Sequence, residues 1–292
     1  MNIVSIINQK GGVGKTTTSV NLGAALGRMG RRVLLIDLDP QGNLGTHLGL
    51  DVEAIKPTIY EVLTRDAPLV EAVQDTPEAN VRCVPANLDL SAAELELVSI
   101  VGRETLLADA LKRLVEEGKE TYDDVLLDCP PSLGVLTINA LTACGRVLVP
   151  LQTEFFALSG MARLTEVISL VQRRLNPGVH LWGIVACKVD SRPRLTQEVM
   201  DEVSAYFGDR LMKTIIRPNI KLAEAPSHGL SVLTYAPSSN GARDYMRLAR
   251  EFLGMPLDAE EEIEAALRPP PAPVEAEERP AEPARTREQE GF

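Results

Sequence analysis

The residues with the clearest chemical potential form one glycine-rich segment near the N-terminus, Gln9-Lys10-Gly11-Gly12-Val13-Gly14-Lys15-Thr16-Thr17. It follows an apolar run and opens a stretch of helical periodicity, which is the strand–loop–helix context that a phosphate-binding loop requires. Glycines bring backbone N–H groups close to a phosphate, and the helix N-terminus adds its dipole. In such a loop Lys15 reaches the β and γ phosphates of a nucleotide, and the Thr16 hydroxyl binds Mg²⁺. The predicted nucleotide-binding residues are Lys10, Gly11, Gly12, Val13, Gly14, Lys15, Thr16 and Thr17.

The loop departs from the common pattern Gly-x-x-x-x-Gly-Lys-Ser/Thr, because Gln9 occupies the first glycine position. Lys10 instead stands directly before the glycines, which gives the deviant Walker A arrangement Lys-Gly-Gly-x-Gly-Lys-Thr. Lys15 and the loop backbone already serve one nucleotide. A second ammonium on the outside of the loop could therefore reach a nucleotide held by another subunit.

The elements that must position this loop are short apolar runs alternating with amphipathic stretches. Near-continuous Val, Ile and Leu runs are typical of parallel strands covered on both faces. The predicted strands are Ile3–Ile7, Val33–Asp37, Val81–Pro85, Asp124–Asp128, Arg146–Pro150, Leu181–Cys187 and Met212–Ile216. The predicted helices are Thr16–Met29, Arg103–Glu117, Leu158–Leu175 and Thr196–Phe207. This alternation predicts a single α/β domain over residues 1–254, with a doubly wound, mostly parallel sheet and helices on both faces.

Charge is distributed unevenly along the 292 residues, which carry 30 Lys+Arg and 41 Asp+Glu for a net charge of −11. Residues 257–292 hold 11 acidic residues, 4 basic residues and six prolines. Beyond an acidic helical turn around 259–267, this composition buries little apolar surface, so we expect residues 255–292 to form a disordered, Pro/Glu-rich tail. Residues 188–250 hold ten bases and seven acids, so the acidic total does not exclude nucleic-acid binding.

Several protein classes are excluded by what the sequence lacks. Its four cysteines form no Cys-x-x-Cys pair, which argues against zinc ribbons and thioredoxin chemistry. No apolar run reaches the roughly 20 residues that span a bilayer, and no signal-peptide pattern opens the chain. We therefore expect a cytoplasmic protein.

With this loop the chain resembles the ParA/MinD group of deviant Walker A P-loop ATPases, and most of all its ParA/Soj chromosome-partitioning branch. The resemblance covers about residues 1–254 and continues through further motifs in the family's order. These are Arg32–Asn43, similar to the second strand and switch I; Leu126–Ser132, similar to the Walker B strand and switch II; and Thr137–Leu141, Pro150–Leu158 and Leu222–Gly229.

The resemblance implies roles for the matching residues. Lys10 would contact the ATP of the partner subunit, and Thr17 would lie beside the α-phosphate. Asp39 would orient the attacking water, and Asp128 would reach Mg²⁺ through water. The implied catalytic residues are Asp39, Lys10 and Lys15, and the implied metal-binding residues are Thr16, Asp39 and Asp128.

Two further positions lie near the switch I motif and near the predicted adenine site. Asp37 could anchor the switch backbone or be linked to the metal, and the sequence leaves both interpretations open. Where relatives often read Pro-Arg-Asn, this chain has Arg217-Pro218-Asn219. The resemblance places this segment near the adenine, which makes Pro218 a candidate contact.

The function implied is an ATP-dependent sandwich homodimer that binds DNA non-specifically at the nucleoid. A ParB-type centromere-binding protein would stimulate ATP hydrolysis and release the dimer. The sequence opens on the first strand, without a preceding helix-turn-helix segment, so we expect the ATPase dimer itself to contact DNA. The candidate DNA-binding residues are Arg192, Lys221, Arg243, Arg247 and Arg250.

Four alternatives belong to other functional classes. A MinD-like ATPase should end in a basic amphipathic helix that binds anionic lipid, whereas this chain ends in an acidic segment, so we expect no membrane contact. A cluster-bearing reductase would need paired cysteines, and Cys129 has no evident partner. A cargo-positioning P-loop ATPase acting without DNA and a metabolic P-loop ligase or synthetase remain open. ATP-dependent DNA binding would distinguish the partitioning protein from both.

Overall fold

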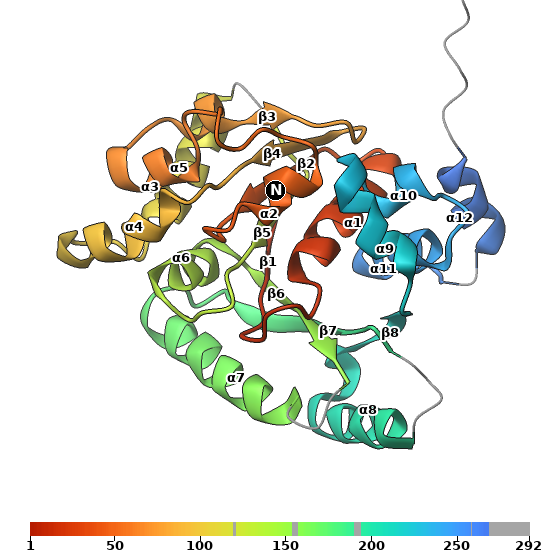
Figure 1. The fold of residues 1–292 in the computed structure, drawn as a ribbon. Helices are drawn as coiled ribbons and strands as arrows, with labels where there is room; N and C mark the ends of the chain where they lie inside the picture. The colour runs from red at the N-terminus through yellow and green to blue at the C-terminus, as the bar shows by residue number, and fades with distance from the viewer. Residues whose placement is uncertain (119–120, 154–156, 190–193, 258, 269–292) are drawn as a thin grey trace, which may run out of the picture.

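The computed structural model describes the chain except for residues 119–120, 154–156, 190–193, 258 and 269–292. Eight strands form one sheet in the order β3-β4-β2-β5-β1-β6-β7-β8 (Figure 1). All neighbouring strands are parallel except β3 and β4. The predicted doubly wound, mostly parallel α/β fold is therefore confirmed.

The strands lie where the buried apolar runs predict them. Their bounds are β1 (Asn2–Ile6), β2 (Val33–Asp37), β3 (Gln74–Asp75), β4 (Val81–Val84), β5 (Asp124–Asp128), β6 (Arg146–Gln152), β7 (His180–Cys187) and β8 (Leu211–Ile216). The sequence analysis missed β3, since two residues paired at an edge carry no periodic signal.

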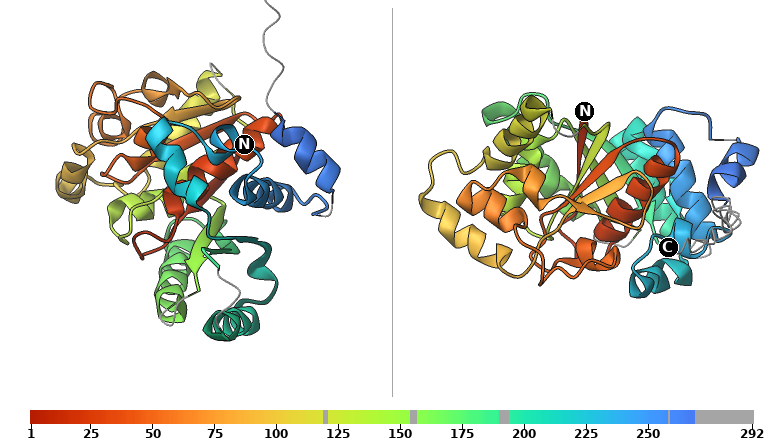
Figure 2. Two further views of the ribbon diagram at one scale, coloured as in Figure 1. Left: turned by 45° about the vertical axis from the view of Figure 1, so that its right-hand side comes forward. Right: turned by 90° about the horizontal axis from the view of Figure 1, so that it is seen from above.

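Helices cover both faces of the sheet, as the view from above in Figure 2 shows. One face carries α3 (Ile59–Arg65), α4 (Leu90–Glu96), α5 (Leu106–Glu117), α6 (Val135–Ala143), α7 (Ala157–Arg174) and α8 (Arg194–Phe207). The other carries α1 (Lys15–Arg28), α2 (Asn43–His47), α9 (Ile220–Glu224), α10 (Val232–Tyr235), α11 (Asn240–Phe252) and α12 (Glu260–Leu267). Short 3₁₀ segments are η1 (Leu69–Ala72), η2 (Leu97–Ser99), η3 (Gly208–Arg210) and η4 (Ala225–His228).

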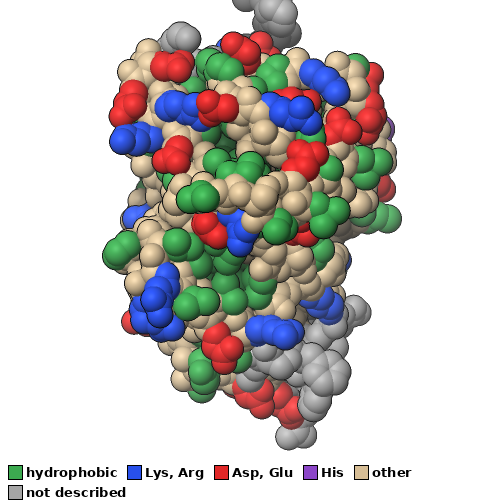
Figure 3. All heavy atoms as spheres, turned by 90° about the vertical axis from the view of Figure 1, so that its left-hand side faces the viewer, with side chains coloured by type: hydrophobic (Ala, Val, Ile, Leu, Met, Phe, Trp, Pro, Cys, Tyr) green, Lys and Arg blue, Asp and Glu red, His purple; other side chains and the backbone are tan. Residues whose placement is uncertain are grey.

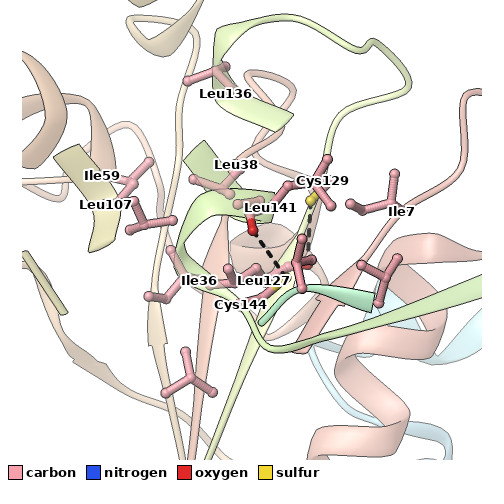
Figure 4. Close-up of a cluster of buried hydrophobic side chains, with 14 of the residues drawn as sticks. Ile7, Ile36, Leu38, Ile59, Leu107, Leu127, Cys129, Leu136, Leu141 and Cys144 are labelled. Carbon is pink, nitrogen blue, oxygen red and sulfur yellow. Dashed lines mark hydrogen bonds between the residues drawn. The ribbon is translucent and has the colours of Figure 1, made fainter. Parts of the chain in front are cut away.

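Each face of the sheet has its own apolar core. Figure 4 shows part of the core on the α3–α8 side, which includes Ile36 of β2, Leu127 of β5, and Leu136 and Leu141 of α6. Removing this apolar surface from water is the main favourable contribution to folding. Because the two cores fix β1, β2 and β5 side by side, the loops that leave these strands meet at one edge of the sheet.

The C-terminal segment corrects one expectation. Residues 260–267 form a helix that packs against α11, and its Ile263 and Leu267 are buried in the core (Figure 1). The carbonyl of Ala266 also accepts a hydrogen bond from Arg28 of α1. The packed chain therefore extends to Leu267 rather than ending at 254, because two apolar side chains one turn apart are enough to dock this acidic helix.

Candidate nucleotide-binding site

The glycine-rich loop joins β1 to α1 as predicted. Gly12 and Gly14 have φ angles of 73° and 104°, a region that side chains disfavour. Gly14 caps α1, and its carbonyl accepts the first helical hydrogen bond from Thr18. The N-terminal N–H groups of α1 are therefore presented to the loop, where they can bind an anion.

Lys15 lies inside this loop with its side chain largely buried. Its Nζ donates a hydrogen bond to the carbonyl of Lys10 at 3.3 Å. Burial lowers the pKa of Lys15, and the carboxylates of Asp128 and Asp39 oppose that effect. A bound polyphosphate would add negative charge beside the ammonium and favour its protonated form.

Asp128 ends β5 at the bottom of the site, beside Asp37 of β2 in the parallel register. Ser19 Oγ donates to Asp128 Oδ1 at 2.9 Å, while Oδ2 is buried without a hydrogen-bond partner in the described structure. Burial raises the pKa of Asp128 to about 6, although the hydroxyls of Thr16 and Ser19 counteract it. An unpartnered buried carboxylate oxygen beside a threonine hydroxyl fits Mg²⁺ or one of its water ligands.

No group of three or more His, Cys, Asp or Glu side chains that could hold a metal is found in the described part of the chain. A Mg²⁺ ion at Thr16 and Asp128 would therefore complete its coordination with phosphate oxygens and water, as Mg²⁺ commonly does.

The structure also decides the role of Asp37. Its carboxylate is fully buried and accepts hydrogen bonds from the backbone N–H groups of Asp39, at 3.0 Å, and Leu44, at 3.1 Å. Both oxygens thus hold the chain after β2, which supports the interpretation of Asp37 as a backbone anchor. Asp39 itself is half-buried, and its Oδ1 accepts from the N–H of Gln41 at 3.0 Å.

A cavity of about 390 Å³ lies beside the loop and is bounded by Val13, Thr17, Pro218, Leu222 and Tyr245. Its walls are mainly apolar, and it opens next to the N-terminus of α1. Pro218 lines this cavity, and its contact with the adenine stays a prediction. The volume and apolar character suit a nucleobase.

The candidate DNA-binding residues are placed differently from one another. Arg192 lies outside the described residues. Lys221 Nζ pairs with Glu224 at 2.7 Å and lies over the ring of Tyr235. Figure 3 shows the opposite side of the molecule from α9 and α11, and there Lys and Arg alternate with Asp, Glu and hydrophobic side chains without a continuous basic surface among the described residues.

The arginines of α11 share one helix face, as their spacing predicts, but that face is covered by α12. Arg243 pairs with Glu264, Arg247 with Glu260 and Arg250 with Glu262. Only 5% of the Arg250 side chain is exposed, and its Nε donates to the carbonyl of Pro256 at 2.6 Å. The assignment of Arg250 to a DNA surface is therefore wrong, because its guanidinium is buried in the packing of the C-terminal helix.

Two residues of the site were missed by sequence reasoning. Ser19 lies three residues after Thr16 on α1, so its closeness to the predicted metal-binding hydroxyl could have been read from the sequence. Lys188, just after β7, donates from Nζ to the carbonyl of Gly12 at 2.7 Å. No local pattern marks it, because its partner is distant in the sequence.

With this geometry established, comparisons with known proteins are informative. A family model described as an AAA domain matches residues 1–181. The sporulation initiation inhibitor protein Soj of Bacillus subtilis is 46% identical over 249 residues, covering 85% of this chain and 97% of Soj. This chain belongs to the Soj/ParA family.

Two further relatives are informative about this Soj/ParA chain. The chromosome-partitioning ATPase Soj of Treponema pallidum is 47% identical, covering 85% of this chain and 95% of that protein. A solved structure named cobyrinic acid a,c-diamide synthase from Mycobacterium smegmatis, with bound ADP and magnesium, is 38% identical with a TM-score of 0.75. The match covers 87% of this chain and 94% of the synthase chain. In the Soj/ParA chain, no described helix is long and apolar enough to cross a membrane.

Proposed function

We propose that this Soj/ParA family member is a Mg²⁺-dependent ATPase that partitions chromosomal or plasmid DNA. The observation that carries the ATPase assignment is the convergence of Lys15, Asp39 and Asp128 at a glycine loop that caps α1. Phosphoryl transfer needs cations, a metal and a group that orients water, held in fixed positions. Identity of 46–47% to two Soj proteins supports the partitioning role.

Each residue of the site has a defined task in this proposal. Lys15 and the N–H groups of the loop bind the β and γ phosphates, and Thr17 lies near the α-phosphate. Thr16 and Asp128 would hold Mg²⁺, which supplies charge neutralisation at the phosphate oxygens. Asp39 orients the attacking water, while Asp37 keeps the Asp39 backbone in position through the hydrogen bond described above.

The cycle requires a second copy of the chain. Lys10 is exposed on the outside of the loop, where it could reach a nucleotide across a subunit interface. The ATP-bound sandwich dimer would bind DNA non-specifically at the nucleoid through backbone phosphates. A ParB-type centromere-binding protein would stimulate hydrolysis and release the dimer from DNA.

One experiment separates this proposal from a cargo-positioning ATPase that acts without DNA. Binding to a random-sequence duplex is measured with ATP, with ADP and without nucleotide, at one fixed salt concentration. Partitioning by an ATP dimer predicts strong binding with ATP alone. Equal or absent binding in all three conditions would contradict the DNA-dependent part of the proposal.

The structural likeness to the diamide synthase raises a metabolic alternative. Attack on an amide nitrogen donor such as glutamine commonly uses an accessible cysteine thiolate. All four cysteines of this chain are buried, and burial raises the pKa of each thiol above its ordinary value. These buried thiols are therefore unsuited to nucleophilic attack on glutamine.

A further inference from the structure

Helix α12 holds acidic side chains against the basic face of α11 in a regular register. Arg243 and Arg247 are one turn apart on α11, and their partners Glu264 and Glu260 are one turn apart on α12. The two helices therefore run antiparallel with matched charges. Arg250 pairs with Glu262, which lies between Glu260 and Glu264 in the sequence, so this third pair falls outside the antiparallel register. Arg243, Arg247 and Arg250 together form the arginine row of α11.

The outer two pairs of this row remain open to solvent. The side chains of Arg243 and Arg247 are 40% and 38% exposed, and those of Glu264 and Glu260 are 59% and 48% exposed. Exposed ion pairs of this kind are individually weak, so the phosphates of a polyanion could replace the glutamates. The glutamates nonetheless compete well, because buried Ile263 and Leu267 fix α12 in place and keep their local concentration high.

We propose that α12 is a built-in acidic cover that occupies the arginine row of α11 and lowers the affinity of this protein for DNA. The inference rests on the proposed DNA-partitioning function and names a regulation of it. Phosphate oxygens and the carboxylates of Glu260 and Glu264 bind the same guanidinium groups. Loss of these carboxylates frees Arg243 and Arg247 for DNA without loosening the helix.

Glu260 and Glu261 form a matched pair for the test. They are neighbours on α12 and each carries one negative charge, but Glu260 pairs with Arg247 whereas Glu261 has no ion-pair partner in the described structure. Glu260→Gln and Glu261→Gln therefore remove the same charge from almost the same place. Only Glu260→Gln frees an arginine.

The measurement is affinity for a random-sequence duplex with ATP over a series of salt concentrations. We expect Glu260→Gln to bind several-fold more tightly than Glu261→Gln, with a salt slope steeper by about one unit for each subunit that gains a phosphate contact. The double variant Glu260→Gln/Glu264→Gln should add about one further unit per subunit. Arg247→Ala should cancel the gain of Glu260→Gln, and ATPase activity without DNA should stay at the wild-type level in every glutamate variant.

The outcomes separate the inference from the function on which it rests. Wild-type binding in ATP with equal affinities for Glu260→Gln and Glu261→Gln would overturn the cover alone. If wild type and all variants failed to bind DNA with ATP, the proposed function would fall, and the cover with it.

A second, independent observation concerns Lys188, which bridges β7 and the phosphate loop. Its backbone has φ 55°, an unfavourable conformation for lysine that is maintained beside the site. Its Nζ donates to the Gly12 carbonyl at 2.7 Å, and it borders the same cavity as Val13 and Pro218. In a trans peptide the carbonyl of Gly12 and the N–H of Val13 point in opposite directions.

We infer that Lys188 is a positioning residue for the nucleotide phosphates. By binding the Gly12 carbonyl, it fixes the direction of the Val13 N–H in a loop whose amides cradle phosphate. Lys188 acts through the peptide and not on the reacting atoms. Its contribution should therefore depend on whether the ligand carries phosphates.

The test compares ADP with adenosine. Lys188→Met should weaken ADP binding about tenfold, the cost of one misaligned charge-assisted contact, and leave adenosine binding within about twofold. Lys188→Arg should restore ADP binding, whereas Lys213→Met, which removes an exposed lysine from β8, should change neither ligand. Equal losses for ADP and adenosine, or wild-type ADP affinity in Lys188→Met, would overturn the assignment.

Discussion

The hydroxyl of Ser19 donates a hydrogen bond of 2.9 Å to the carboxylate of Asp128, joining the first helix to the end of β5. The carbonyl of Lys15 lies 3.1 Å from the same hydroxyl and shares its single proton, so the Ser19 side chain is held between the phosphate loop and the acid. The contact leaves the other oxygen of Asp128 available for a cation. Ser19 thus orients the proposed metal-binding group.

Ser19→Ala should raise the Mg²⁺ concentration required for half-maximal ATPase activity roughly tenfold, because outer-shell partners of metal ligands carry effects of this size. The measurement is a Mg²⁺ titration of ATP hydrolysis, with the exposed Ser99→Ala as the control. An unchanged Mg²⁺ requirement in Ser19→Ala would show that Asp128 does not depend on this hydrogen bond.

Asp39→Ala should retain ATP binding and dimerisation but lose hydrolysis, because it removes the water-orienting carboxylate and leaves the phosphate cradle intact. The trapped dimer should persist on DNA. Single-turnover hydrolysis and nucleotide affinity are measured together, and turnover near the wild-type rate would remove Asp39 from the catalytic role.

Lys10→Ala should separate nucleotide binding from dimerisation. The monomer keeps Lys15 and the loop amides, so its ATP affinity should survive, whereas the cation that crosses to the partner is lost. Sedimentation with ATP measures the outcome, and dimers of wild-type stability would argue against the sandwich arrangement. Lys213→Ala, an exposed lysine outside the loop, is the control.

Truncation after Gly254 should reduce the free energy of unfolding by about 3 kcal/mol, since the buried contacts of Ile263 and Leu267 are lost. Arg250 would also lose Glu262 and the Pro256 carbonyl. Truncation after Arg268 keeps α12 and should leave stability unchanged, because the remaining sequence is poor in large apolar residues. Urea denaturation of both truncated proteins tests this, and equal stabilities would show that α12 contributes nothing.

Acidification should destabilise the protein through His47, the last residue of α2. Burial lowers the pKa of His47 from 6.5 to about 4, so the unfolded chain binds a proton between these values that the folded chain does not. His47 therefore contributes stability that is present above pH 6.5 and is lost as the pH falls toward 4. From pH 7 to pH 5 the loss is about 2 kcal/mol. Urea unfolding at both pH values should show that wild type and the exposed-site control His228→Gln lose about 2 kcal/mol more than His47→Gln, because the raised pKa of Asp128 acts in the opposite direction in all three proteins.

The sequence by itself determined the phosphate loop, because the Lys10–Thr17 segment makes its site from consecutive residues. It also determined seven of the eight strands, since parallel strands buried on both faces appear as continuous apolar runs. The roles of Asp39 and Asp128 come from the family resemblance and stay predictions, but their placement could be predicted from the sequence: each lies at or just after the carboxyl end of a strand, and those ends meet at one edge of the sheet.

Tertiary structure alone decided the relationships between distant residues. The spacing of Arg243, Arg247 and Arg250 places them on one face of α11, but it does not show whether that face contacts DNA or another helix. Only the docking of α12 shows that Arg250 is covered. Likewise, Lys188 and Gly12 are 176 residues apart in the sequence. No sequence pattern predicts that β7 brings Lys188 next to the phosphate loop. Local sequence fixes which groups a segment carries, but the partners of those groups depend on how buried apolar faces pack, and that packing is a property of the whole chain.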